Sequence, residues 1–249
     1  MARITVVINQ KGGVGKTSTA HALGTGLIKK GYKVLIVDTD PQGNISHTMQ
    51  ADTIGKGLYE AMKEEFPAAE LIQRTSQGDI LPSTLLLTAA DMEFVSTGRE
   101  YILETVLEPV KNNYDYIVID SPPQLGILTI NALVAADDVI IPMTADIYSL
   151  QGLNQLYSTI NKVWKFCKKN IVISGLLLTR YSDRTILSRD LKERIETKAG
   201  ELGSKLYNVI IRESVSIREA QTARQSIFDY APKSNPALDY MDFIAEYLK

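Results

Sequence analysis

The stretch "INQKGGVGKTS", residues 8–18, places a glycine-rich turn between an apolar run and a segment with helical periodicity. It follows the phosphate-binding pattern G-x-x-x-x-G-K-[ST], except that the first glycine, six positions before Lys16, is replaced by Gln10. A second lysine, Lys11, stands inside the loop. The stretch therefore predicts a phosphate site that carries an additional positive charge.

The residue types of this loop suit a nucleotide polyphosphate. Glycines let the backbone curl, so that several N–H groups and a helix N-terminus point at one anion. Lys16 would reach the β- and γ-phosphates, and Thr17 would offer its hydroxyl to Mg²⁺. A glycine-rich turn without a ligand is the alternative. The expected nucleotide-binding segment comprises Gly12, Gly13, Val14, Gly15, Lys16, Thr17 and Ser18.

The chain around this loop alternates short β-branched runs with longer segments of helical period. This pattern predicts an α/β fold with a mainly parallel twisted sheet flanked by helices, in a single domain over residues 1–249. The expected strands are 3–9, 33–38, 79–83, 115–120, 137–143, 170–179 and 205–211. The expected helices are 16–30, 98–109, 125–135, 149–166, 185–199, 216–223 and 237–248. Residues 52–78 give no clear pattern.

Three aspartates follow expected strands, where the sites of parallel sheets lie. Asp120 suits a second anchor for magnesium, or else a cap for the next turn. Asp38 would steady the waters of the metal, and Asp40 would orient or deprotonate the attacking water. A solvated turn started by Asp-Pro is the alternative for these two.

Composition excludes several classes of protein. No apolar run approaches the roughly 18 residues of a membrane span, and no secretory segment precedes the loop, so we expect a cytoplasmic protein. Cys167, the single cysteine, cannot form an internal disulfide or a cysteine-rich metal site. Residues 162–224 hold fourteen Lys or Arg against seven Asp or Glu, whereas the remainder holds thirteen against twenty-two. The C-terminal half of the chain, which contains this stretch, could therefore present a basic face.

Several blocks together resemble the ParA-type partition ATPases, the ParA/Soj-like branch of the MinD/ParA superfamily. "KGGVGKTS" matches their deviant Walker A form of the P-loop, K-G-G-x-G-K-[ST], and "DTDPQGN" resembles their switch I segment. "IDSPPQLGILTINAL" is similar to their Walker B and switch II, and "TADIYSLQGLNQL" continues the likeness. The resemblance covers nearly the whole chain and is weakest at 52–78.

The resemblance gives the additional lysine a role. It implies that Lys11 crosses a sandwich dimer, held together by Mg-ATP, and touches the phosphates bound by the other subunit. Each of two facing triphosphates needs a cation from across the interface, which makes this arrangement chemically sensible. Lys11, Lys16 and Asp40 would then serve a slow ATPase. A solvated lysine that helps its own phosphate is the alternative for Lys11.

The resemblance also implies non-specific DNA binding by the ATP dimer, association with the nucleoid, and stimulation of hydrolysis by a ParB-like partner. Arg184 matches a DNA-contacting position of the family, whereas Arg218 lies near a second such position that Ser216 occupies here. Further DNA-binding candidates, for which a solvated helix face is the alternative, are Lys162, Lys165, Lys168 and Lys169.

The C-terminal half departs from the family at the segment that lines the base pocket. Family members often carry Pro-Arg-Asn there, whereas this chain has Ile211, Arg212 and Glu213. Arg212 is therefore a nucleotide-binding candidate through this likeness.

The sequences at the two ends of the chain indicate which members of the superfamily it resembles. "PALDYMDFIAEYLK", at 236–249, is too acidic for a basic membrane helix, and we expect a docked helix with no membrane partner. Its expected core face comprises Leu238, Met241, Ala245 and Leu248. Because the motif starts by residue 9, we expect no N-terminal helix-turn-helix domain.

Three alternatives to DNA partition are compatible with parts of this pattern. An orphan relative could position a protein cargo with the same chemistry. An iron-sulfur electron-transfer ATPase would need paired cysteines, and Cys167 stands alone. A scaffold that binds nucleotide without hydrolysis would lack a water-activating carboxylate such as Asp40.

Overall fold

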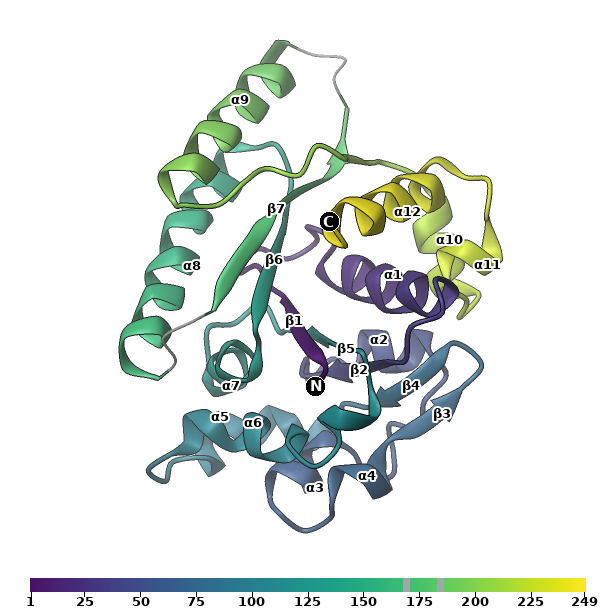
Figure 1. Cartoon of the computed structure of the whole chain (residues 1–249), viewed down its shortest axis with the longest axis vertical. Helices are drawn as coiled ribbons and strands as arrows, with labels where there is room; N and C mark the ends of the chain where they lie inside the picture. Colours follow the sequence, from purple (N-terminus) through teal and green to yellow (C-terminus); the bar gives the residue numbers. More distant parts are fainter. Residues whose placement is uncertain (168–170, 183–185) are drawn as a thin grey trace.

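The computed structural model describes residues 1–167, 171–182 and 186–249, and these form an α/β fold around an eight-stranded sheet (Figure 1). The strand order is β3-β4-β2-β5-β1-β6-β7-β8. Neighbouring strands run parallel except β3, which pairs antiparallel with β4. The strands are β1 (Arg3–Val7), β2 (Val34–Asp38), β3 (Gln73–Thr75), β4 (Gly78–Leu81), β5 (Tyr116–Asp120), β6 (Asp138–Met143), β7 (Val172–Tyr181) and β8 (Ile211–Arg212). The predicted fold class is confirmed.

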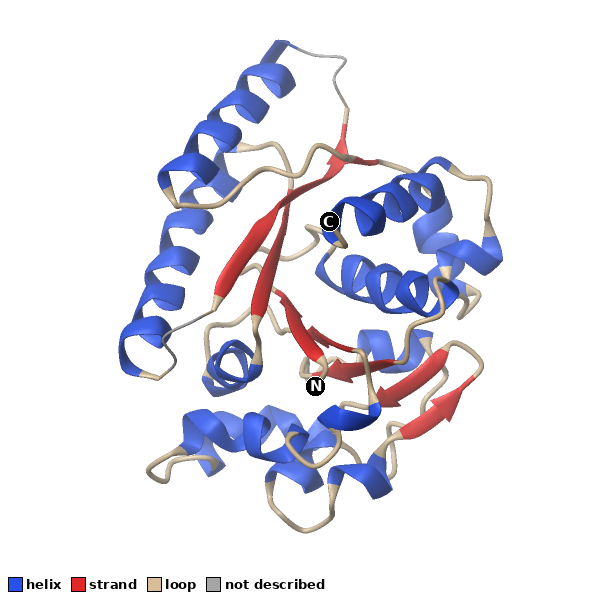
Figure 2. Ribbon diagram, in the orientation of Figure 1, coloured by secondary structure: helices blue, strands red, loops and turns tan. Residues whose placement is uncertain are grey.

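Helices cover both faces of the sheet (Figure 2). One face packs against α1 (Lys16–Lys29), α2 (Asn44–Thr48), α10 (Ser216–Thr222), α11 (Ile227–Tyr230) and α12 (Asn235–Tyr247). The other face packs against α3 (Leu58–Met62), α4 (Ala68–Leu71), α5 (Ala90–Glu93), α6 (Ile102–Leu107), α7 (Ile127–Ala135), α8 (Ile147–Phe166) and α9 (Ile186–Glu201). Short 3₁₀ turns lie at η1 (Leu85–Ala89), η2 (Arg99–Tyr101) and η3 (Lys111–Asn113). Burial on both faces explains why the central strands are continuously apolar.

The register of the central strands brings three strand ends to one level. Val7 of β1 and Asp38 of β2 are both register partners of Asp120 of β5. The chain enters the loop of residues 8–15 directly after β1 and leaves it into α1. The loop and two of the predicted aspartates therefore meet at the carboxyl edge of the sheet.

The expected strand at 205–211 is largely wrong. Only a single bridge joins Leu206 to Leu176 of β7, before the chain returns as the two-residue strand β8. The backbone N–H groups of Asn208 and Val209 donate instead to the carboxylate of Glu246 on α12, at 3.0 and 3.1 Å. The carboxylate of Glu246, which is distant in the sequence, thus accepts hydrogen bonds from N–H groups that would otherwise pair with a neighbouring strand.

The C-terminal helix docks on the core, and the predicted face is only partly the buried one. Met241 and Leu248 pack against the core as predicted, whereas Leu238 and Ala245 are exposed. The buried residues of the helix are Tyr240, Phe243, Ile244 and Tyr247. None of the described helices is long and apolar enough to span a bilayer. The unclear stretch 52–78 holds helices of only five and four residues and a three-residue strand, which are too short for periodicity to reveal.

Candidate nucleotide site

The glycine-rich loop takes a conformation that requires glycine at two positions. Gly13 and Gly15 have φ angles of 74° and 82°, in the left-handed region that L side chains avoid. Between them, Val14 is buried and its carbonyl accepts a hydrogen bond from Thr179 Oγ1 at 2.8 Å. The loop is therefore fixed from below by an anchor on β7.

Lys16 lies at the first turn of α1 and is only 8% exposed. Its Nζ donates to the carbonyl of Lys11, 3.1 Å away. Burial lowers the pKa of the Lys16 ammonium, whereas Asp120 and Asp40 oppose this shift. A buried ammonium at a helix N-terminus favours the binding of an anion such as a phosphate.

Asp38 and Asp120 lie fully buried beneath the loop. Asp38 accepts hydrogen bonds from Ser46 N at 3.0 Å, from Ser46 Oγ at 2.6 Å and from Asp40 N at 3.1 Å. Burial raises the pKa of Asp38 to about 7, although the Ser46 hydrogen bonds oppose it. Burial and the neighbouring Asp38 raise the pKa of Asp120 well above its ordinary value, with Thr17 and Lys16 in opposition.

Asp120 has the environment of a ligand to a cation. Within the described ranges, neither of its carboxylate oxygens makes a hydrogen bond of regular geometry, even though the Thr17 hydroxyl lies close enough to influence it. Buried carboxylates are normally paired or bound to a metal. Across the described residues, no three His, Cys, Asp or Glu side chains gather as a metal cage. Mg²⁺ needs no such cage, because it usually takes one or two carboxylates together with waters and phosphate oxygens.

Asp40 lines the cavity above the loop. Its Oδ1 accepts from Gln42 N at 3.0 Å, and its carbonyl accepts from Ser83 Oγ at 2.6 Å. These two hydrogen bonds fix Asp40 in the turn after β2. Its carboxylate lies at the wall of the cavity that the phosphate loop also lines.

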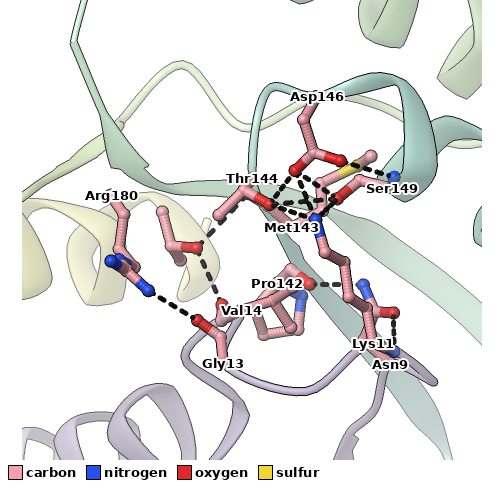
Figure 3. A network of polar contacts seen from close by, with 11 residues as sticks. Asn9, Lys11, Gly13, Val14, Pro142, Met143, Thr144, Asp146, Ser149 and Arg180 are labelled. Carbon is pink, nitrogen blue, oxygen red and sulfur yellow. Dashed lines mark hydrogen bonds and ion pairs between the residues drawn. The ribbon is translucent and has the colours of Figure 1, made fainter.

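The side chain of Lys11 turns away from its own loop (Figure 3). Its Nζ lies 2.6 Å from Asp146 Oδ2 and 3.4 Å from the hydroxyls of Thr144 and Ser149. Burial opposes ionisation of Asp146, but the hydrogen bonds from Lys11, Thr144 and Ser149 lower its pKa to about 2. Asp146 also caps α8 by accepting from Ser149 N. An ion pair thus holds the ammonium in the isolated chain.

A cavity of about 450 Å³ extends from the phosphate loop across α1. Its loop end is formed by Gly12, Gly13, Gly15, Lys16, Thr17, Ser18, Asp40, Gln42, Asn44 and Pro123. The cavity is also lined by Thr179 and Arg180, which contact the loop, and by Ile211, Glu213, Ser214, Ile217, Arg218, Gln221 and Tyr240. A cavity that combines an anion site with apolar walls can hold a nucleotide.

Two predicted residues take positions that their predicted roles do not anticipate. The guanidinium of Arg212 pairs with Asp239 on α12, with Nη2 to Oδ1 at 2.6 Å, and it faces a neighbouring hollow rather than this cavity. Arg218, a DNA-binding candidate, is exposed and also lines the nucleotide cavity. Ile211 and Glu213, on either side of Arg212, line the cavity as well.

Of the other basic candidates, the structure describes Lys162 and Lys165, which lie far from Arg218 in the fold. Lys162 and Lys165 are exposed on α8, which covers the opposite face of the sheet from the α10 helix of Arg218 (Figure 1). Arg184, Lys168 and Lys169 lie outside the described residues.

Two residues of the site, Asp146 and Arg180, escaped sequence reasoning. Asp146 could have been found, because Asp before a helical run is an N-cap signal. Arg180 carries no such signal, since its ion pair with Glu213 joins residues 33 positions apart, with Nη2 to Oε1 at 2.9 Å.

Comparisons with known proteins agree with this geometry. The family described as AAA domain matches residues 2–173. The sporulation initiation inhibitor protein Soj of Bacillus subtilis is 39% identical over 99% of this chain and 98% of its own length. The chromosome partitioning protein ParA of Myxococcus xanthus is 36% identical over 100% of this chain and 89% of its own length. A structure named cobyrinic acid a,c-diamide synthase from Mycobacterium smegmatis, with bound ATP analog and magnesium, superposes with a TM-score of 0.82 at 30% identity, covering 98% of this chain and 93% of that one.

Proposed function

The chain belongs to the ParA family of P-loop partition ATPases, and from this premise we propose that it segregates plasmid or chromosome DNA through an ATP-driven cycle. Mg-ATP drives sandwich dimerisation, the dimer binds DNA without sequence preference, and a ParB-like partner stimulates slow hydrolysis. The observation that carries this proposal is the buried Asp120 carboxylate beneath the phosphate loop, close to Lys16 and Thr17, which makes no hydrogen bond of regular geometry to any residue that the structure describes.

ATP and Mg²⁺ are the cofactors for which this site is suited. The loop N–H groups and the Lys16 ammonium hold the phosphates, and Val14 and Ser18 belong to the same binding segment. Thr17 and Asp120 would hold Mg²⁺, and Asp38 would support the site from below. When bound, the ion offsets the negative charge of the β- and γ-phosphates.

Asp40 prepares the nucleophile in this proposal. Its carboxylate lies 7% exposed at the cavity wall, where it can accept a proton from a water that approaches the terminal phosphate. Carboxylates in this role contribute roughly 10²–10⁴-fold to rate. Hydrolysis that depends on one such residue and on an activating partner fits a slow intrinsic ATPase.

Lys11 acts in trans. Its ammonium already points away from its own loop, 2.6 Å from Asp146, so that a modest movement would present it to another molecule. The apolar side chains of Ile147 and Tyr148, 55% and 71% exposed, lie directly beside this ion pair. A charged residue bordered by exposed apolar surface supports a contact with a second copy of the chain.

The decisive experiment measures the oligomeric state of an Asp40→Ala variant by gel filtration with light scattering. With Mg-ATP we expect a stable dimer, and with Mg-ADP a monomer. A Lys16→Ala variant is the matched control and should remain monomeric in both. If the ATP-loaded Asp40→Ala protein stays monomeric at high concentration, the role of Lys11 across an interface is wrong.

The DNA step has a separate test. The proposed contacts are Arg184, Arg218, Lys162, Lys165, Lys168 and Lys169, in a cytoplasmic protein that associates with the nucleoid. Arg184→Glu should dimerise normally but lose retention of DNA at moderate salt, because phosphate contacts dominate such binding. Unchanged retention would remove Arg184 from the DNA surface.

A ParA-like ATPase that positions a protein cargo instead of DNA uses the same nucleotide cycle. An ATPase assay with and without DNA distinguishes the two cases, because only a DNA-dependent cycle responds to DNA together with the ParB-like partner.

A further inference from the structure

The stretch of residues 83–95, which follows β4, begins in contact with the turn that carries Asp40. Ser83 is buried, its Oγ donates to the carbonyl of Asp40 at 2.6 Å, and its N–H donates to Ser46 Oγ at 3.0 Å. Ser46 Oγ in turn donates to Asp38 Oδ2 at 2.6 Å. The start of the stretch is thus tied to the two aspartates at the end of β2 and just beyond it.

The same stretch contacts the segment that follows Asp120. Asp91, in α5, accepts a hydrogen bond from the N–H group of Ile127, the first residue of α7, at 2.7 Å. A carboxylate in this place satisfies a free N–H group of the helix and stabilises its N-terminus. Residues 83–95 therefore connect the segments that carry Asp40 and Asp120.

The outward side of this stretch is apolar. Leu87, Ala90 and Phe94 are buried in the core, whereas four large apolar side chains nearby are between 53% and 78% exposed. These four side chains form what we call the 85–95 surface, and they are Leu85, Leu86, Met92 and Val95. Exposed apolar side chains concentrated in one short stretch are typical of a contact with another protein.

The surroundings of this surface are acidic. Residues 57–108 hold ten Asp or Glu against three Lys or Arg, and their helices α3, α4, α5 and α6 lie together on one side of the sheet (Figure 1). Glu93, within the stretch, pairs with Lys63 Nζ at 3.1 Å, and Glu64 and Glu65 are exposed beside Lys63. Because like charges repel, this side of the molecule disfavours DNA and a second copy of itself, and it favours a basic partner.

We propose that the 85–95 surface binds an amphipathic helix with basic residues beside its apolar face, and that this helix belongs to the partner that stimulates ATP hydrolysis. This inference rests on the proposed stimulation by a partner protein. Apolar contact supplies affinity, and the acidic surroundings select a basic helix. Through Ser83 and Asp91, a bound helix also fixes the turn of Asp40 and the start of α7, which orders the site for reaction.

The probe for this surface is a synthetic helical peptide of about 18 residues, or about five turns, with leucine along one face and lysine on both sides of that face. A matched peptide carries glutamate in place of lysine. Fluorescence anisotropy with the full chain loaded with Mg-ATP measures binding. The lysine peptide should bind at least about tenfold more tightly than the glutamate peptide, and its binding should weaken as salt is raised.

Met92→Lys places a positive charge in the 85–95 surface and should weaken the lysine peptide by about tenfold or more. Its unstimulated hydrolysis and its ATP-dependent dimer should equal those of the wild type. Leu238→Lys, at an exposed leucine on α12 across the sheet, is the matched control and should bind the peptide normally. A weaker dimer in Met92→Lys would assign the surface to the contact between two copies of the chain and overturn the inference.

Phosphate release measures the link to the nucleotide site. The lysine peptide should raise the wild-type rate at least about threefold. Asp91→Ala should bind the peptide within about twofold of the wild type, because it loses one of several carboxylates. It should show less than about half of the stimulation, because the start of α7 is released.

Three results would contradict the inference. The lysine peptide could bind Met92→Lys as tightly as the wild type, it could bind without a change in the rate of hydrolysis, or Asp91→Ala could respond as fully as the wild type. A wild type that responds to the peptide through Met92 but neither dimerises nor binds DNA would refute the proposed function and leave this inference standing.

Discussion

The phosphate end and the exposed rim of the nucleotide cavity are built in opposite ways. At the phosphate end, Lys16, Asp38 and Asp120 are buried, and their positions follow from the loop and from the aligned ends of β1, β2 and β5. At the rim, Arg180 and Glu213 are more than half exposed, and they are held by an irregular strand, by their ion pair and by the hydrogen bond from Arg180 to the Gly13 carbonyl. Substitutions at the rim should therefore disturb the fold less than substitutions at the phosphate end.

The largest expected effect tests the phosphate end. Lys16→Ala should weaken ATP binding by at least about 100-fold, because charge-assisted hydrogen bonds contribute roughly 1.5–3 kcal/mol each. Isothermal titration with Mg-ATP measures this loss. A change of less than tenfold would mean that the loop N–H groups alone hold the phosphates. The buried side chains of the phosphate end would then matter less for binding than their burial suggests.

The next effect separates binding from chemistry at the same end. Asp40→Ala should lower the partner-stimulated rate of hydrolysis by about 100-fold or more while it leaves ATP affinity within a few-fold of the wild type. Measurement of phosphate release beside nucleotide binding checks both values. Should the variant hydrolyse ATP at the normal rate, another group must activate the water.

A smaller effect concerns the ion pair between Lys11 and Asp146. Asp146→Asn removes the charge that binds the ammonium but keeps a side chain able to cap α8. We expect the ATP-dependent dimer to form at up to about fivefold lower concentration, because a partly exposed ion pair contributes roughly 1 kcal/mol or less. Sedimentation at several protein concentrations gives the dimer constant.

Asp146→Ala provides the comparison for this variant, since it also removes the helix cap and should lower the unfolding free energy by about 1 kcal/mol. A weaker dimer in Asp146→Asn would indicate that Asp146 supports the dimer instead of restraining the monomer.

The smallest expected effect measures the backbone strain at Arg180. Arg180→Gly and Arg180→Ala both lose the ion pair, but only glycine adopts the observed φ of 51° without cost. The glycine variant should therefore be more stable than the alanine variant by about 1 kcal/mol in chemical denaturation. Equal stability would show that the backbone relaxes when the arginine is removed.

Much of the phosphate end is predictable from the amino-acid sequence. The loop motif is contiguous, and parallel strands deliver their carboxyl ends to one edge, so the order of residues alone assigns Lys16, Thr17, Asp40 and Asp120 to one site. The contacts of Arg218 and Arg212 were not predictable in this way. Arg218 lines the nucleotide cavity and Arg212 pairs with Asp239, and no local sequence pattern indicates either contact.

The sequence by itself determined the alternation of strands and helices, the parallel sheet and the phosphate loop, because these depend on neighbouring residues and on a fixed period. The tertiary structure alone decided that Glu246 takes the N–H groups of an expected strand, that Asp146 holds Lys11, and that a bulge aims Arg180 at Glu213. Each of these is a contact between residues more than 30 positions apart. Such contacts form only when packing brings distant polar groups together, and no local pattern records them.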